Sequence, residues 1–245
     1  MNPTIELLKG HRSIRQFQNR PIQTDLFQDL IKAGQAAASS NFFQAVTIIR
    51  VTDPKKRAKL ASLANNQAYV ETAAEFLVFC ADMNRAASCC ALHGAEANTG
   101  FTEQFIIATV DAALVAQNIV VASESAGLGI CYIGALRNNP SEVSTVLDLP
   151  HDTYPVFGLC LGWPDQDPEV KPRLPIDVVL RENSYGIGED GLNLGNYDEA
   201  VRGYYATRSS NQKSMSWSEQ MSGMLSKESR PHMLDFLKTK GFLQK

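Results

Sequence analysis

The longest apolar stretch of the chain, Phe105 to Ala126, constrains the fold more than any other segment. Polar residues such as Asp111 and Glu124 interrupt it too often for a lipid-facing membrane span. The stretch therefore predicts a buried or half-buried helix over 102–125, which the Gly127–Gly129 segment ends. A helix that is apolar on much of its circumference needs apolar partners from the rest of the fold.

Short apolar runs of strand length alternate with helical patterns on both sides of this helix. We expect strands at 45–51, 76–80, 130–133 and 156–161, and helices at 24–38, 54–63 and 141–147. Asp53 followed by Pro54 supplies a cap and a first-turn proline for the second of these helices. The order predicts a sandwich of helices on a mainly buried sheet.

The amino-acid composition of the sequence changes after Gly162. Four prolines in residues 163–175 predict an extended loop, and 178–180 reads as one further strand. A glycine-rich connection at 186–195 leads to three amphipathic pieces, around 197–205, 217–225 and 233–237. Such a tail cannot form its own core, so it must lie on the main domain or on a second subunit, which favours a dimer. We therefore expect one domain over 1–245, with 163–245 as an excursion.

The composition narrows the function classes. The chain of 245 residues has 23 Lys plus Arg against 26 Asp plus Glu, a net charge of -3, too balanced for a dedicated nucleic-acid binder. The amino terminus has no apolar run followed by a small-residue cleavage site, so we expect a cytoplasmic protein that does not enter a membrane. Five scattered cysteines predict neither a disulfide framework nor a metal site, and Cys89–Cys90 is expected at the surface.

Familiar catalytic signatures are missing from the sequence. It has no GxGxxG directly after a predicted strand, no GxxxxGK[ST] and no GxSxG. The chain is therefore either a binding module or an enzyme in which a cofactor does the chemistry.

Two basic clusters remain, far apart in the chain. One comprises His11, Arg12, Ser13 and Arg15, and the other is Lys171-Pro172-Arg173. Guanidinium forks, an ammonium and a hydroxyl match a phosphomonoester, although each cluster alone also suits a solvated charged turn.

Small and polar segments accompany them at the ends of predicted elements. These are Ser39-Ser40-Asn41-Phe42, Asn65-Asn66-Gln67 and Tyr132-Ile133-Gly134. Amide and backbone groups of this kind suit a flat heterocycle with donors and acceptors, such as an isoalloxazine.

These motifs together resemble a known family. The segments TIELLKGHRSIRQF, AAEFLVFCAD, VDAALVAQNIVVASESAGLGICYIGALRN, VFGLCLGWPDQDPEVKPRLP, YYATRSSNQK and WSEQMSGMLSKESRPHMLDFL resemble the flavin-dependent nitroreductase family. Within it they are most similar to the oxygen-insensitive NADPH nitroreductases and the NADPH–FMN oxidoreductases (flavin reductase P). The resemblance covers nearly the whole chain.

The resemblance implies an α+β fold, a three-layer α/β/α sandwich with a mixed, mainly buried sheet. It implies a homodimer with one FMN per subunit and a carboxy-terminal excursion that wraps the partner subunit. It also implies that the FMN phosphate is held by His11, Arg12, Ser13, Lys171 and Arg173.

The remaining roles come from the same resemblance. Arg15 would stabilise the reduced flavin, Ser39, Ser40 and Gln67 would contact its ring or ribityl chain, and Tyr132, Ile133 and Gly134 would line its other side. Arg208 and Lys213 would bind the NADPH 2′-phosphate, while Asn41 and Phe42 would shape the substrate pocket. Asn41, Asn65-Asn66, Ala135 and the stretch 87–100 depart from the family pattern.

The implied activity is hydride transfer from NADPH through FMN to small-molecule electron acceptors: nitroaromatics, quinones or free flavin, in two-electron ping-pong steps. Two alternatives stay open. One is a flavin reductase that supplies reduced FMN to another enzyme, and the other is a non-catalytic flavin-binding dimer scaffold.

Overall fold

The computed structural model describes residues 2–186, 188–208 and 212–245. It divides into two compact units, Met1–Asp167 with Arg230–Lys245, and Pro168–Ser229. We expected the excursion to include everything after residue 162. In the structure the second unit begins five residues later, and the last sixteen residues belong to the first unit.

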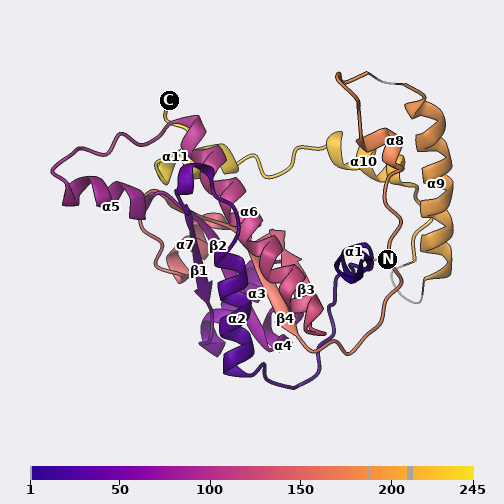
Figure 1. The fold of residues 1–245 in the computed structure, drawn as a ribbon, viewed down its shortest axis with the longest axis horizontal. Coiled ribbons are helices and arrows are strands. Elements are labelled where there is room, and N and C mark those ends of the chain that lie inside the picture. The colour runs from indigo at the N-terminus through magenta and orange to yellow at the C-terminus, as the bar shows by residue number, and fades with distance from the viewer. Residues whose placement is uncertain (1, 187, 209–211) are drawn as a thin grey trace. The chain divides into compact units, whose positions relative to one another are not determined.

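The first unit is built on a four-stranded sheet with the order β1-β2-β4-β3 (Figure 1). Its strands are β1 (Val46–Arg50), β2 (Glu75–Asp82), β3 (Gly129–Ile133) and β4 (Thr153–Gly162). Each neighbouring pair is antiparallel, so the α+β class is confirmed, but these strands do not form the mixed sheet that we expected. The parallel contact among the described residues is a single bridge between Ser13 and Ile130.

The first unit contains the helices α1 (Pro3–Lys9), α2 (Thr24–Gln35), α3 (Pro54–Leu63), α4 (Tyr69–Thr72), α5 (Asn84–Leu92), α6 (Thr102–Ser125), α7 (Pro140–Val146) and α11 (Met233–Thr239). Helices α2 and α6 cover one face of the sheet, and α3 and α7 cover the other. Two short 3-10 helices, η1 (Ser40–Phe42) and η2 (Gly134–Asn138), complete the unit. As predicted, Asp53 caps α3 by accepting from the Lys55 amide, and Pro54 opens the helix.

Strand β2 shows why the sheet has two cores. Leu77, Phe79 and Ala81 pack into a cluster with α2 and α6, whereas Phe76 and Val78 pack into a second cluster with α3 and α7. Alternate side chains of a strand point to opposite faces, so a strand whose central residues 76–81 are all apolar must be covered on both. The predicted three-layer arrangement is confirmed.

Helix α6 has the range that the sequence predicts and lies against the sheet. It is the helix, among the described residues, that is long and apolar enough to cross a membrane by length and composition. Its apolar residues have another explanation, because Ala108, Ala112, Ala116 and Val120 are buried in the core of the first unit. On a different side of the helix, Ile106, Val110 and Leu114 are exposed.

The second unit consists of α8 (Ile176–Val179), α9 (Asp190–Thr207) and α10 (Trp217–Leu225). The strand that we expected at 178–180 is wrong, because a single helical turn occupies the end of the proline-rich segment. Only the first part of the glycine-rich stretch 186–195 is a connection, because α9 begins at Asp190 and includes Gly191 and Gly195. Tyr197, Val201 and Tyr205 form the small core of this unit.

Candidate flavin and nucleotide site

The basic segment near the amino terminus lies beside the first residues of β3. The Ile14 amide donates to the Ile130 carbonyl over 2.8 Å, and the Ile14 side chain is buried. Gly129 is required here, since a Cβ at that position would lie 2.6 Å from Cγ1 of Ile14. In extended chain, neighbours of a buried side chain point the other way, so Ser13 and Arg15 face away from Ile14.

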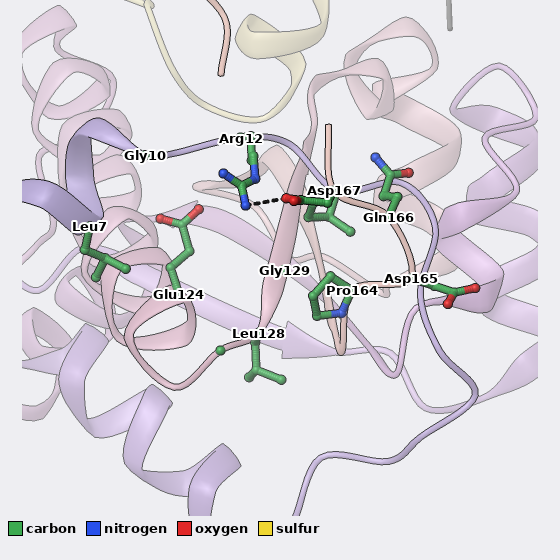
Figure 2. A pocket seen from close by; sticks show the side chains of 12 residues that line it. Leu7, Gly10, Arg12, Glu124, Leu128, Gly129, Pro164, Asp165, Gln166 and Asp167 are labelled. Carbon is green, nitrogen blue, oxygen red and sulfur yellow. Dashed lines mark hydrogen bonds and ion pairs between the residues drawn. The ribbon is translucent and has the colours of Figure 1, made fainter. Parts of the chain in front are cut away.

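His11 and Arg12 both have carboxylate partners in the first unit. His11 Nδ1 lies 2.6 Å from Glu124 Oε1, and Arg12 Nη2 donates to Asp167 Oδ1 over 2.5 Å. Arg12, Glu124 and Asp167 line a cavity of about 620 Å³ (Figure 2). A guanidinium has five N–H donors, so the contact with Asp167 leaves Arg12 with donors for another anion.

Arg15 reaches the segment that carries Gln67. Its guanidinium lies near the hydroxyl of Tyr69, the first residue of α4. Burial raises the pKa of the Tyr69 hydroxyl, and the Arg15 contact only partly offsets this effect. Burial likewise raises the pKa of Cys131 on β3, against the charge of Arg15. Arg15 is therefore placed between the start of α4 and strand β3.

Gln67 carries an unsatisfied acceptor. Among the described residues its Oε1 is buried and has no hydrogen-bond partner. The two preceding residues, Asn65 and Asn66, have φ of 63° and 55°, a conformation that asparagine tolerates better than most residues. Asn138 Nδ2 donates to Asn65 Oδ1 over 3.0 Å and helps to hold this turn. A buried acceptor without a donor costs free energy, so the side chain is set for a donor from outside the chain.

The segment 39–42 lies between α2 and β1, as predicted, and is attached to α6. The Ser39 hydroxyl donates to Asp111 over 2.7 Å, and the Ser40 amide donates to the same carboxylate over 3.4 Å. Asn41 is exposed, and Phe42 is 80% exposed. An aromatic ring so exposed next to a candidate site is available for contact with a ligand.

At the end of β3 the three predicted residues differ in what they offer. Ile133 is fully buried in the second core, so only its backbone is available to a ligand. Tyr132 is half-buried, and burial followed by the charge of Glu124 raises the pKa of its hydroxyl to about 12. Gly134 begins η2, and a Cβ there would approach the Arg137 guanidinium at 3.2 Å.

In the second unit, three of the predicted phosphate-binding cations surround one tyrosine. Nζ of Lys171, Cζ of Arg208 and Nζ of Lys213 lie 5.2, 5.9 and 5.6 Å from the ring centroid of Tyr205. Arg173 is near enough for its charge to act on Tyr197, whose pKa is nevertheless raised, chiefly by burial. Arg208 Nε is buried and has no partner among the described residues. The sequence separates Lys171 from Arg208, but the fold of this unit brings them together.

The same cluster changes the acidity of the tyrosine. Burial alone would raise the pKa of Tyr205, but a hydrogen bond from Lys171 and the charges of Lys171, Lys213 and Arg208 lower it overall. Cations that stabilise a phenolate also stabilise a phosphate. Tyr205 is thus part of an electropositive centre that the sequence analysis did not identify.

The sequence reasoning also missed Tyr69 and Asp111. A signal for Asp111 was present, because it is a carboxylate within the most apolar helix of the chain. Nothing in the sequence indicated that Tyr69 would meet Arg15.

Comparisons with known proteins identify the family of this chain. Residues 8–163 match the model of the nitroreductase family, and residues 171–245 match that of the nitroreductase family C-terminal domain. The chain belongs to the nitroreductase family.

Named relatives are similar over their whole length. The chain is 49% identical to an NADPH-flavin oxidoreductase of Vibrio harveyi, with 100% of both chains covered. It is 45% identical to an oxygen-insensitive NADPH nitroreductase of Salmonella typhimurium, with 99% of both covered. A solved structure of the NADPH:FMN oxidoreductase from Vibrio harveyi complexed with NAD+ matches with a TM-score of 0.92 at 46% identity, covering 100% of both chains.

Proposed function

We propose that this protein is an FMN-dependent oxidoreductase that takes a hydride from NADPH and reduces nitroaromatics, quinones or free flavin. Relatives named for NADPH-dependent flavin reduction and nitroreduction support an enzyme of this kind. The observation in this chain that carries the proposal is the buried, unpartnered Oε1 of Gln67. An isoalloxazine ring has an N–H that suits such an acceptor.

The residues present fit FMN. The phosphate would be held by His11, Arg12, Ser13, Lys171 and Arg173, and the ring and ribityl chain by Ser39, Ser40, Gln67, Tyr132, Ile133 and Gly134. The structure narrows two of these roles. The Ser39 hydroxyl already donates its hydrogen bond to Asp111, so Ser39 would accept a hydrogen bond or use its backbone. The Ile133 side chain is in the core, so Ile133 would use its backbone alone.

When bound, FMN accepts a hydride from NADPH and passes electrons on. The part assigned to this chain is electrostatic: Arg15 would lie against the pyrimidine edge of the flavin, where negative charge collects on reduction. Tyr69 supports this role, because its hydroxyl lies close enough to the Arg15 guanidinium to orient it. A charge fixed in advance stabilises developing charge without having to reorganise.

For the nucleotide, we assign the 2′-phosphate of NADPH to Arg208, assisted by Lys213. The unpartnered Nε of Arg208 supports this role, because it is a buried donor that an anion would satisfy. Asn41 and Phe42 would border the pocket of the electron acceptor, and their exposure leaves them free to do so.

The absorption spectrum tests this function against its alternatives. We expect purified protein to be yellow, or to become so with FMN, and NADPH to bleach it under anaerobic conditions. Steady-state rates with nitroaromatics, quinones and free FMN then separate a nitroreductase from a flavin reductase that supplies another enzyme. FMN that binds but is never bleached would favour the non-catalytic scaffold, and a protein that binds no FMN would refute every flavin function.

We also propose a homodimer. Ile106, Val110 and Leu114 are exposed along one side of α6, and Ile5 and Leu8 are exposed on α1. Residues spaced by four form one stripe on a helix, and an exposed apolar stripe marks an interface. Val110→Glu is expected to shift the mass measured by light scattering to that of a monomer, and Gln28→Glu, on the exposed face of α2, is the control. An unchanged mass for Val110→Glu would place the interface elsewhere.

The cytoplasm is the proposed location, because free thiols such as the exposed Cys89 suit a reducing compartment. Small-molecule electron acceptors, and neither nucleic acid nor membrane, are the proposed partners. Fractionation of cells that express the full chain tests the location.

A further inference from the structure

The segment between α2 and β1 has an unusual backbone. Asn41, Phe42 and Gln44 have φ of 46°, 59° and 50°. Left-handed conformations are unfavourable for residues with a Cβ, and they persist only where the surroundings hold them. Three such residues within four positions therefore need an external support.

Arg85 contributes one contact, because its Nη1 donates to the Gln44 carbonyl over 3.1 Å, but both ends of the segment are attached to a single carboxylate. Asp111 Oδ2 accepts from the Ser39 hydroxyl over 2.7 Å and from the Ala45 amide over 2.9 Å. Its Oδ1 accepts from the Ser40 amide over 3.4 Å, and the side chain is 1% exposed. Ser39 Oγ in turn accepts from the Gln44 amide over 2.7 Å. Both ends of the segment are thus attached to the same side chain.

The partners of this carboxylate are unusual for a buried acid. The hydrogen bonds described for Asp111 come from the hydroxyl and the amides of this segment, and the ion pairs described elsewhere in the chain do not include it. A buried charge needs such bonds, and bonds to an ionised acceptor are stronger than neutral ones. Asp111 also lies on the 24-residue helix α6, a rigid support compared with a loop.

We propose that Asp111 is a positioning residue of the flavin site: it holds 39–45 in the shape that presents Ser40, Asn41 and Phe42 to FMN and to the electron acceptor. The proposal rests on the FMN function above. It does not require Asp111 to touch either ligand. Without the carboxylate, the left-handed residues relax and the segment must be ordered again each time FMN binds, which weakens binding.

Two substitutions separate the contacts of Asp111. Asp111→Ala removes all three hydrogen bonds. In Asp111→Asn the amide oxygen can take the place of Oδ2 and keep the bonds from Ser39 and Ala45, while its NH₂ faces the Ser40 amide and cannot accept from it. Asp111→Asn should therefore keep most of the order of the segment and most of the FMN affinity.

The first measurement is hydrogen exchange of the Ser40, Gln44 and Ala45 amides in protein stripped of FMN. We expect exchange at least about tenfold faster in Asp111→Ala and intermediate in Asp111→Asn. The hydrogen bonds to Asp111 oppose local opening of the segment in the wild type, and the variants lose all or some of them. The second is the Kd of FMN by quenching of its fluorescence. We expect it to rise about tenfold or more in Asp111→Ala and less in Asp111→Asn.

Ile107→Ala is the matched control, because it creates a cavity on the same buried side of α6 but leaves in place the hydrogen bonds that hold the segment. It should lower the melting temperature but leave the Ser40 and Ala45 amides and the FMN Kd near wild type. The proposal is refuted if this control loosens the segment as much as Asp111→Ala, or if a loosened segment leaves the FMN Kd unchanged. Failure of the wild-type protein to bind FMN would instead refute the proposed function.

Discussion

Replacing Gln67 by methionine should have opposite effects on the free protein and on FMN binding. Methionine is unbranched and similar in length, but it lacks the buried Oε1 that has no partner among the described residues. In the free protein that unsatisfied oxygen destabilises the fold. If FMN supplies its donor, the same oxygen stabilises the complex.

The magnitude follows from the cost of an unsatisfied buried acceptor, about 1–3 kcal/mol. Removing the acceptor should stabilise FMN-free protein by about 1–2 kcal/mol, which raises the melting temperature by about 2–8 °C in a chain of this size. The lost bond should weaken FMN binding by about 1–3 kcal/mol, a rise of roughly 5- to 150-fold in Kd.

The assay is a thermal melt of FMN-stripped protein together with a fluorescence titration of FMN. Gln28→Met, on the exposed face of α2, is the control and should change neither value appreciably. A lower melting temperature for Gln67→Met would mean that Oε1 is already satisfied in the free protein. A higher melting temperature with an unchanged Kd would mean that the oxygen does not face FMN.

Three further predictions concern the cations of the second unit. Arg173→Ala should weaken FMN retention during dialysis by a few kcal/mol, and Lys171→Ala should do so less, because an ammonium makes a point contact rather than a fork. Arg208→Ala should raise the KM for NADPH by about tenfold to a hundredfold and leave NADH turnover and bound FMN nearly unchanged, because only NADPH has the 2′-phosphate. Raising the pH should weaken NADPH binding through Tyr205, whose pKa is lowered, since its phenolate would compete with the 2′-phosphate for Lys213 and Arg208.

The tyrosine prediction has a defined sign. A pKa that is lower in the folded protein contributes stability above the unfolded value near 10, and this contribution is lost as the pH falls through the folded value. Tyr205→Phe should remove both this contribution and the extra loss of NADPH affinity at alkaline pH, as measured by melts and by KM across the pH range. Identical pH profiles for the wild type and Tyr205→Phe would contradict the role of Tyr205. Full retention of FMN by Arg173→Ala would contradict the phosphate site. Equal losses of activity with NADPH and NADH in Arg208→Ala would assign Arg208 to the fold.

The main elements of the first unit were predictable because their signals are local. Helix α6 has its predicted range, and the strands of the sheet lie within a few residues of their apolar runs. Periodicity and capping act over a few residues, so they can be recognised without knowing the fold. Strand direction depends on how distant segments pair, which explains why the mixed sheet was wrong. The turn at Ile176–Val179 went unrecognised because three apolar residues are typical of a strand as well as of a helix.

The sequence by itself determined which chemical groups the protein has: two basic clusters, amide-rich turns and a long apolar helix that includes the carboxylate of Asp111. Only the tertiary structure decided what these groups do to one another. It brought Arg15 to Tyr69, turned Ile133 into the core and placed Lys171 beside Arg208 around one ring. Hydrogen bonds and charges act over a few ångströms, whereas these partners are separated by tens of residues along the chain, so only the fold specifies their contacts.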